Sequence, residues 1–276
     1  MAGVQRDPAE RLDRGLAGRL ADHIDTAWAA AGRPILVGLC GPQGCGKSTL
    51  AGKVDRALKT LGRSSVVLSI DDLYLTRQER GRLAADVHPL LAVRGPPGTH
   101  DMALAAVVLD ALLQGTPVRL PRFDKGRDDR LGDQPLVVGP TDVILFEGWC
   151  VGARAEPADA LAEPVNALER EEDPESVWRA YVNQALAGSY RALFDRLDLY
   201  VLLQAPSFDV VVGWRQEQEH GLRRRSGAGM SDPQVARFVQ HYERLSRHIA
   251  REAPHRADVV VWLDEARQPI QIESRS

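Results

Sequence analysis

The sequence predicts an α/β fold with a mainly parallel central sheet and helices on both faces. Short apolar runs without polar alternation, which are typical of strands buried on both faces, recur along the chain. Segments with helical periodicity lie between these runs, and strands that alternate with helices favour a parallel sheet. The chain has 276 residues, 44% of them hydrophobic, which is enough to bury a large core. We expect one domain over residues 1–276.

The expected elements follow one another in a regular order. Residues 1–32 contain a leading amphipathic helix from about residue 8, with apolar side chains at helical spacing from Leu12 to Trp28. Strands are expected at 34–40, 64–70, 142–149, 198–205 and 257–264. Further helices are expected from the glycine-rich loop to about residue 59, and at 102–115, 174–197, 207–221 and 231–252. Segments 120–140 and 220–233 fit neither pattern, and such long loops are usually functional.

Composition excludes several classes of protein. The formal net charge is −3, so no basic field indicates a nucleic acid or a membrane surface as partner. No apolar run reaches the ~18 residues of a membrane span, and the charged N-terminus lacks the apolar centre of a secretory signal. The three cysteines, Cys40, Cys45 and Cys150, form no metal-ligand spacing, and their odd number argues against a disulfide framework. We therefore expect a cytoplasmic protein.

The stretch VGLCGPQGCGKSTLAGKV, residues 37–54, predicts a phosphate-binding loop. Gly41, Gly46, Lys47 and Ser48 fill the pattern G-x-x-x-x-G-K-[ST]. Glycines let backbone amides turn toward phosphate oxygens, and the following helix presents its positive end to the same anion. A chance match in a Gly-rich turn is the alternative, but a buried strand before the loop and a helix after it favour a nucleotide site.

Each residue type in this loop has a chemical reason. Lys47 reaches the β- and γ-phosphates, and the Ser48 hydroxyl ligates Mg²⁺. The loop therefore predicts a P-loop NTPase with a nucleoside triphosphate, for which we take ATP, and Mg²⁺ as cofactors, but by itself it does not distinguish a kinase from a GTPase or a motor. The nucleotide-binding residues are Gly41, Pro42, Gln43, Gly44, Cys45, Gly46, Lys47, Ser48 and Thr49.

Carboxylates end two of the predicted strands, at the edge of the sheet where ligands bind in such folds. Asp71 and Asp72 follow the second strand, and Glu147 lies in the third. Successive side chains of an extended segment point to opposite faces, so only one of the two aspartates faces the phosphates. We assign the catalytic base to Asp71, and Asp72 caps the next helix or holds a metal-bound water. Glu147 belongs to the Mg²⁺ shell, although these acids also fit simple helix caps or ion pairs.

Two other nucleotide-binding classes fit poorly. A guanine-reading switch needs an Asn-Lys-x-Asp motif, and the only asparagines, Asn166 and Asn183, lie outside such a pattern. A motor or oligomeric ATPase needs no acceptor pocket, whereas this chain has a large region between its strands that suits one.

Taken together, these motifs make the chain resemble the phosphoribulokinase and uridine kinase branch of P-loop kinases, and within it the D-glycerate 3-kinase group. The matching segments run in the same order from about residue 35 to 265. They are GPQGCGKSTL, SIDDLYLT, RGPPGTHD, PRFDKGRDDR, ILFEGWCVG, LQAPSFDVVVGWRQEQE and GMSDPQVARFVQHYERL. The combination is far more specific than the phosphate loop alone.

The resemblance implies roles for particular residues. The aspartate that opens the motif after the second strand is the base in that branch, which is Asp71 here. The glutamate of the EG strand serves the metal, which is Glu147 here. An arginine-bearing lid closes over the phosphates and maps to Arg215–Arg225, within a lid segment of about 207–232. The substrate of the glycerate group would be carried by GTHD and PRFDK.

An acidic substrate suits the cations of these loops. Glycerate has a carboxylate, which a guanidinium grips with two parallel hydrogen bonds. The loops offer Arg94, Arg122, Lys125, Arg127 and Arg130. A nucleoside would need an aromatic platform, for which the loops offer only Phe123. A solvated loop with internal ion pairs is the alternative interpretation.

We assign the substrate site to His100, Asp101, Lys125, Arg122 and Asp72, with His100 and Lys125 as first choices. Arg215 and one of Arg223–Arg225, for which we take Arg224, offset γ-phosphate charge in the transition state. An exposed anion-binding patch would also explain three consecutive arginines, but the flanking glycines favour a mobile lid. The lid also excludes water that would hydrolyse ATP.

The predicted protein is thus a kinase that transfers the γ-phosphate of ATP to D-glycerate, a small hydroxy acid. The resemblance, not the residues, indicates the 3-hydroxyl. One alternative is a kinase for pantothenate, a nucleoside or a sugar. Another is a regulatory ATP-binding protein without phosphotransfer.

Overall fold

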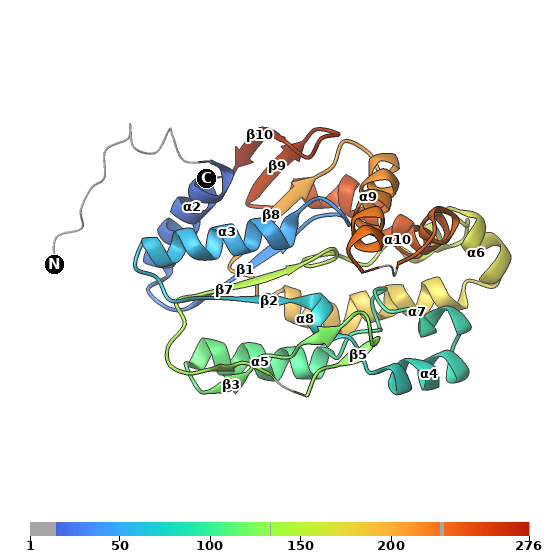
Figure 1. Ribbon diagram of the computed structural model, residues 1–276, viewed down its shortest axis with the longest axis horizontal. Helices are drawn as coiled ribbons and strands as arrows, with labels where there is room; N and C mark the ends of the chain where they lie inside the picture. Colours follow the sequence, from blue (N-terminus) through green and yellow to red (C-terminus); the bar gives the residue numbers. More distant parts are fainter. Residues whose placement is uncertain (1–14, 133, 227–228, 276) are drawn as a thin grey trace.

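A computed structural model describes residues 15–132, 134–226 and 229–275 of the chain (Figure 1). The first two turns of the expected N-terminal helix, up to residue 14, therefore lie outside the described residues. From Leu16 to Ala31 the helix, α2, is present, and Gly32 ends it in a left-handed conformation. This end agrees with the predicted boundary.

A six-stranded sheet forms the centre of the described structure, with strand order β10-β9-β8-β1-β7-β2. All neighbouring strands are parallel except β10, which is antiparallel to β9. The five predicted strands are confirmed, and β10 was not predicted. The strands are β1 Ile35–Cys40, β2 Ser65–Ser69, β7 Val143–Gly148, β8 Leu199–Gln204, β9 Val259–Leu263 and β10 Pro269–Ser274.

Helices cover both faces of this sheet, as predicted (Figure 1). Alternate residues of each central strand enter different hydrophobic clusters, because side chains point to opposite faces. In β1, Leu36 faces the cluster that includes the helices α5 (Met102–Gln114) and α10 (Asp232–Glu252). Val37 faces the cluster that includes α2 and α3 (Lys47–Thr60). Burial on both faces explains why these strands read as continuous apolar runs.

The helices agree broadly with the sequence pattern. The α-helices besides α2 are α3 Lys47–Thr60, α4 Arg77–Asp86, α5 Met102–Gln114, α6 Ala167–Glu172, α7 Val177–Ala185, α8 Arg191–Phe194, α9 Asp209–Ser226 and α10 Asp232–Glu252. Shorter helical turns are η1 Ile70–Leu73, η2 Pro89–Ala92, η3 Ala158–Leu161, η4 Leu186–Tyr190 and η5 Ala253–His255. Within the ranges described above, no helix is long and apolar enough to cross a membrane.

Three segments differ from the prediction. The helix expected over 174–197 is interrupted, because Gly188 adopts the non-helical angles φ −98° and ψ −107° inside the π-helical turn η4. The helix expected to end near residue 221 continues as α9 to Ser226, into the arginine-rich segment. The segment 120–140, expected as loop, carries the ladders β4 Phe123–Asp124 with β5 Asp129–Arg130, and β6 Leu136–Val137 with β3 Val118–Arg119.

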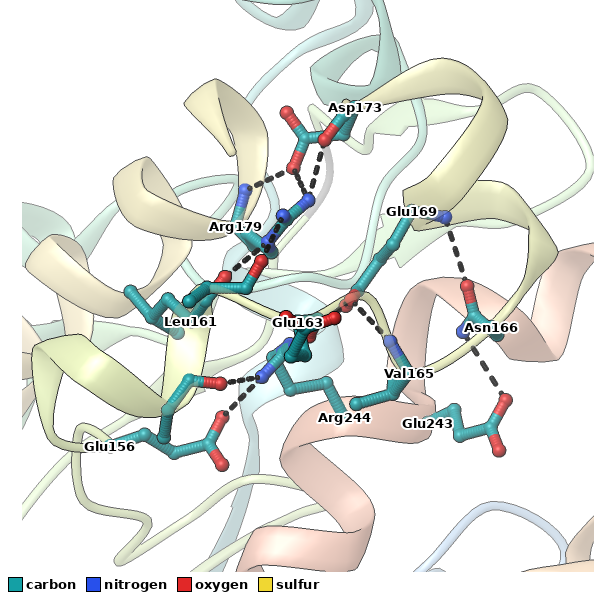
Figure 2. Close-up of polar contacts among 12 residues, drawn as sticks. Glu156, Leu161, Glu163, Val165, Asn166, Glu169, Asp173, Arg179, Glu243 and Arg244 are labelled. Atoms are coloured by element: carbon teal, nitrogen blue, oxygen red, sulfur yellow. Dashed lines mark hydrogen bonds and ion pairs between the residues drawn. The ribbon is translucent and has the colours of Figure 1, made fainter. Parts of the chain in front are cut away.

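A buried network of charges fastens α10 to α6 and the preceding loop (Figure 2). Arg244 of α10 donates to both carboxylate oxygens of Glu169, at 2.8 and 2.7 Å. The same guanidinium donates to the carbonyl oxygens of Ala160 and Glu163. A second buried pair, Arg179 with Asp173 at 3.0 Å, joins α7 to the end of α6. The network matters for function because α10 forms one wall of the site described next.

Candidate active site

The phosphate loop joins β1 to α3 in the predicted way. Gly44 and Gly46 have φ of +78° and +88°, conformations that side chains rarely adopt. At Gly44 a Cβ would also lie 2.7 Å from Cβ of Trp214. Both the backbone conformation and the lack of space therefore favour glycine at this position. No side chain among the described residues caps the start of α3, which leaves the amides of its first turn for an anion.

Cys45 packs beneath the loop. A Cβ at Gly41 would lie 2.8 Å from its Sγ, so Gly41 and Cys45 fit together as a small pair. Burial raises the pKa of the Cys45 thiol, which keeps it protonated. Its side chain therefore shapes the loop from below, and its backbone remains the part that faces a phosphate.

Ser48 and Glu147 meet although they are far apart in sequence. The Ser48 hydroxyl donates to Oε1 of Glu147 at 2.9 Å. Oε2 of Glu147 is buried, and it has no hydrogen-bond partner among the described residues. A buried carboxylate oxygen without a partner beside a hydroxyl is a donor set that suits Mg²⁺. The described residues contain no cluster of three metal-binding His, Cys, Asp or Glu side chains, so phosphates and water would supply the remaining ligands.

Asp71 lies at the carboxyl end of β2, on the turn η1, with both oxygens occupied. Tyr74 donates its hydroxyl to Oδ1 at 2.7 Å, and Lys125 donates Nζ to Oδ2 at 2.6 Å. Burial alone would raise the pKa of Asp71, but the nearby charges of Lys125 and Lys47 outweigh it and hold the pKa well below its usual range. Asp71 is therefore an ionised acceptor at neutral pH.

Lys47 carries its charge in the same region. Burial opposes this charge, but the carboxylates of Glu147 and Asp71 help to raise the pKa of Lys47 above its ordinary value. The phosphate loop thus has a fixed positive charge between two carboxylates, as a site for phosphoryl transfer needs.

Asp72 has other partners than Asp71, although both lie on the 3₁₀ turn η1 and not on the extended strand that the alternation argument assumed. Its Oδ1 accepts from the backbone N–H of Phe123 at 3.1 Å, and its Oδ2 accepts from Arg122 at 2.9 Å. Asp72 thereby ties the hairpin β4–β5 to η1. The expected cap of the next helix is instead Thr76, which forms a capping box with Glu79.

Several of these groups, among them Lys47, Ser48 and Asp71, line one small cavity of about 130 Å³. Cations enter it from separate parts of the chain: Lys47 from the phosphate loop, Lys125 from the hairpin, and Arg215 from α9. Its other lining residues are Gln43, Gly44, Ser48, Asp71, Tyr74, Arg94, Trp149, Gln218, Phe238 and Tyr242. The cavity therefore joins the phosphate loop, the predicted base and cations of three elements in one place.

Of the five cations predicted for substrate binding, only Lys125 and Arg94 line this cavity. Arg122 pairs with Asp72, and Arg130 pairs with Asp101 at 2.9 Å. Arg127 is exposed and lies 3.5 Å from the carboxylate of Asp124.

Arg94 shares Asp128 with a fully buried arginine. Arg94 and Arg80 contact different oxygens of the Asp128 carboxylate, and Arg80 is only 1% exposed. Arg80 also donates to the carbonyl oxygens of Leu75 and Ala92. This arrangement fixes the hairpin and the guanidinium of Arg94 in place.

His100 and Asp101 lie behind the cavity. Tyr190 accepts from the backbone N–H of Gly98 at 2.9 Å, and its hydroxyl shares a hydrogen bond of 2.6 Å with Nδ1 of His100. The His100 ring stacks on Tyr74 at 4.7 Å, and burial lowers its pKa to about 4. Asp101 caps α5 by accepting from the N–H of Leu104. Through its stacked ring, His100 thus supports Tyr74, which donates to Asp71.

The two predicted lid arginines differ in position. Arg215 lines the cavity, donates to Gln218 at 3.1 Å and pairs with Glu219. Arg224 lies nine residues further along α9 and is exposed, outside the lining of the cavity.

Two other hollows adjoin the phosphate loop. A cavity of about 590 Å³ follows the start of α3, from Gly46 and Thr49 to the turn between β9 and β10. A mostly apolar cavity of about 290 Å³ lies behind Gly41, between α9 and α10. Neither is lined by an aspartate or a glutamate, so we place the chemistry in the smaller polar cavity.

Sequence reasoning missed Tyr74, Phe238 and Tyr242 as site residues. Tyr74 had a signal, because residues three apart on a 3₁₀ turn lie on one side, and Tyr74 follows Asp71 by three. Tyr242 looks like any apolar position of α10, yet it donates to the carbonyl oxygen of Arg94 at 2.9 Å. Its place in the wall follows from the packing of α10.

Known proteins resemble this chain over most of its length. It is 37% identical over 258 residues to the "Uncharacterized kinase mug58" of Schizosaccharomyces pombe, covering 87% of this chain and 91% of that protein. It is 33% identical over 257 residues to the chloroplastic D-glycerate 3-kinase of Arabidopsis thaliana, covering 86% of this chain and 54% of that protein. The chain thus matches about half the length of this second relative.

A solved structure has the same arrangement of elements. The D-glycerate 3-kinase from Cryptococcus neoformans var. grubii superposes with a TM-score of 0.81 at 28% identity, covering 95% of this chain and 100% of that one. A comparison with models of known protein families finds no match.

Proposed function

Because the chain belongs to the D-glycerate 3-kinase-like group of P-loop kinases, which are related to uridine kinases, we propose that it transfers the γ-phosphate of ATP to a hydroxyl of D-glycerate. The product would be a phosphoglycerate, and the relatives' names favour the 3-phosphate. The observation that carries the proposal is the small cavity in which Lys47, Asp71 and Lys125 meet. It brings together a phosphate ligand, a base and an exposed lysine that pairs with this base.

The roles of the chain's own groups follow from this geometry. Lys47 and the loop amides hold the β- and γ-phosphates. The acceptor hydroxyl hydrogen-bonds to the ionised Asp71 carboxylate, which takes its proton as the oxygen attacks phosphorus in line. Arg215, which lines the same cavity, offsets the charge of the transferring group.

Ser48 and Glu147 would hold Mg²⁺. The unpartnered Oε2 of Glu147 and the adjoining Ser48 hydroxyl provide the oxygen ligands that this ion prefers. When bound, Mg²⁺ neutralises charge on the β- and γ-phosphates.

The nucleoside of ATP would lie in the larger cavity along the start of α3. Gly46 and Thr49 line this cavity, whereas Gly44 and Lys47 of the same phosphate loop line the smaller one. A triphosphate that follows the loop would therefore extend from one cavity to the other. This extends the predicted nucleotide-binding residues 41–49 to the turn between β9 and β10.

The acceptor side favours a small acid over a nucleoside. Arg94 and Lys125 supply two cations within the polar cavity, and a guanidinium binds a carboxylate with two hydrogen bonds. A cavity of about 130 Å³ suits a molecule of a few carbon atoms better than a base and sugar. His100, Asp101, Arg122 and Asp72 then act by fixing the walls: their contacts are with Tyr74, Arg130 and the β4–β5 hairpin.

We also propose that residues 207–232 act as a lid, carried by α9. Its closure would bring exposed Arg224 toward the phosphates that Arg215 already faces, and would exclude water. For the compartment we propose the cytoplasm, since Cys40, Cys45 and Cys150 are free thiols.

ADP release with Mg-ATP and a panel of acceptors tests the proposal. The panel contains D-glycerate, L-glycerate, pantothenate, uridine and ribulose 5-phosphate. We expect a large rise in ADP release with D-glycerate alone. A rise with a different acceptor would reject the substrate while leaving the kinase, and no rise with any acceptor, together with thermal stabilisation by ATP, would favour a regulatory ATP-binding protein.

A further inference from the structure

We propose that Lys125 locks the Asp71 carboxylate in the substrate-free enzyme and that the carboxylate of an acidic acceptor releases the lock. The inference rests on the proposed function, since it concerns how the same site recognises an acidic acceptor. In this proposal the enzyme prefers acidic acceptors because they free the base Asp71, and not only because they bind more tightly.

The lock is visible in the contacts of Asp71. Its Oδ2 accepts from Nζ of Lys125 at 2.6 Å, and its Oδ1 accepts from the hydroxyl of Tyr74 at 2.7 Å. An acceptor hydroxyl can hydrogen-bond to either oxygen, since each carboxylate oxygen accepts more than one hydrogen bond. When Asp71 takes up the hydroxyl proton, however, it loses the charge that holds Lys125, so one of its two donors must change partner in the course of the reaction.

Tyr74 is poorly placed to leave. It is only 4% exposed, and its ring packs against His100 at 4.7 Å and Phe123 at 5.1 Å. Lys125 is the opposite case, because 59% of its side chain is exposed. In the described residues its ion pair with Asp71 is its one polar side-chain contact. Lys125 is therefore the donor that moves.

The backbone that carries Lys125 remains in place while the side chain moves. Asp72 holds Phe123 and Arg122 at one end of the hairpin. Asp128, at the other end, is held by Arg80 and Arg94. A lysine side chain can swing about such a fixed backbone, and its ammonium stays within the cavity that it lines.

An acidic acceptor offers the ammonium a replacement partner. Its carboxylate enters between Lys125 and Arg94 and takes the hydrogen bond that Asp71 gives up. The acceptor hydroxyl then binds Oδ2 of Asp71. In the transfer, the hydroxyl oxygen forms a bond to the γ-phosphorus, the bond from that phosphorus to the β–γ bridging oxygen breaks, ADP leaves, and the hydroxyl proton passes to Asp71.

A neutral acceptor, or water, offers no such replacement. The ammonium would have to leave a carboxylate without gaining another, and this cost falls on every turnover. The lock thus explains, with one ion pair, how a kinase of this kind would reject both glycerol and water.

The test compares D-glycerate with glycerol, which has the same carbon chain and no charge. In Lys125→Met we expect kcat/KM for D-glycerate to fall by about 10–10²-fold, the cost of a charged hydrogen bond. We expect kcat/KM for glycerol, and ATP hydrolysis without acceptor, to rise at least severalfold, because the base is free. Arg127→Met is the matched control: it removes another hairpin cation, 79% exposed, outside the cavity, and should keep the wild-type preference.

The outcomes separate the lock from the function it rests on. If the wild type phosphorylates no acid of the panel, the proposed function fails. If the wild type phosphorylates D-glycerate but Lys125→Met loses D-glycerate and glycerol turnover equally, Lys125 only binds or positions and the lock is wrong. Unchanged ATP hydrolysis and glycerol turnover in a folded Lys125→Met would overturn it as well.

Discussion

Loss of Arg244 should strongly destabilise this fold, because the arginine neutralises a buried carboxylate. It donates to both oxygens of Glu169, which is fully buried, and the remaining donor to that carboxylate is the N–H of Val165 at 2.9 Å (Figure 2). Arg244→Met keeps much of the side-chain stem but leaves a buried charge without its cation. Breaking a buried pair in this way costs about 3–5 kcal/mol.

Urea unfolding at pH 7 measures this cost. The same helix offers a matched control in Arg237, whose pair with Glu172 is 52% and 41% exposed; Arg237→Met should change the free energy of unfolding by less than about 1 kcal/mol. In a second variant, Arg244→Met combined with Glu169→Leu, stability should partly return, because neither charge is left unpaired. Equal urea midpoints for the Arg244 and Arg237 variants would refute the argument.

The site and its buried histidines allow further predictions. Asp71→Asn should cut turnover by ~10² or more and leave ATP binding nearly intact; isothermal titration and single-turnover rates check both, and wild-type turnover would reject the base. Glu147→Gln should raise the Mg²⁺ concentration for half-maximal activity by about 10–100-fold, and an unchanged Mg²⁺ requirement would contradict its role. Burial lowers the pKa of His100 and His241 to about 4 from the ordinary 6.5. Below pH 6.5 the unfolded chain therefore binds protons that the folded chain does not, so stability should fall between pH 6.5 and 4, by up to about 1.4 kcal/mol per pH unit for each histidine. Urea midpoints across this range should fall less steeply in His241→Gln, and a slope equal to that of the wild type would contradict the assignment.

The central sheet was predictable because its strands are buried on both faces. Runs such as PILVGLC and DVILFEGW lack polar alternation, and the strands Ile35–Cys40 and Val143–Gly148 fall within them. β10 carried no such signal, since it lies at the sheet edge and is mostly exposed. Its residues Ile270 to Glu273 do alternate between apolar and polar side chains, but this pattern spans only four residues and follows a polar turn.

The site was predictable in its local motifs and not in its long-range pairs. The phosphate loop and Asp71 follow from short patterns, whereas the alternation argument for Asp71 and Asp72 assumed an extended strand, and the two residues lie on a 3₁₀ turn. The pairs Asp72 with Arg122 and Asp71 with Lys125 join residues about 50 positions apart. They form only because the hairpin β4–β5 folds back over η1, and the segment around it reads in the sequence as a polar loop.

The break of the helix near Gly188 has a similar cause. The segment 174–197 has helical periodicity throughout, yet Tyr190 must reach His100 with its hydroxyl. A π-helical turn shifts the register of the following residues, and this places Tyr190 in the core. The turn permits a contact between residues that are 90 positions apart in the sequence. Local periodicity carries no information about such a contact.

The identity of the reaction product decides whether the protein phosphorylates D-glycerate. The wild-type protein would be incubated with Mg-ATP and D-glycerate, and the products would be followed by phosphorus NMR. Our account predicts ADP and one phosphate monoester on the primary hydroxyl of glycerate in equal amounts, with no product from Asp71→Asn at the same time point. Release of inorganic phosphate without a glycerate ester would contradict it.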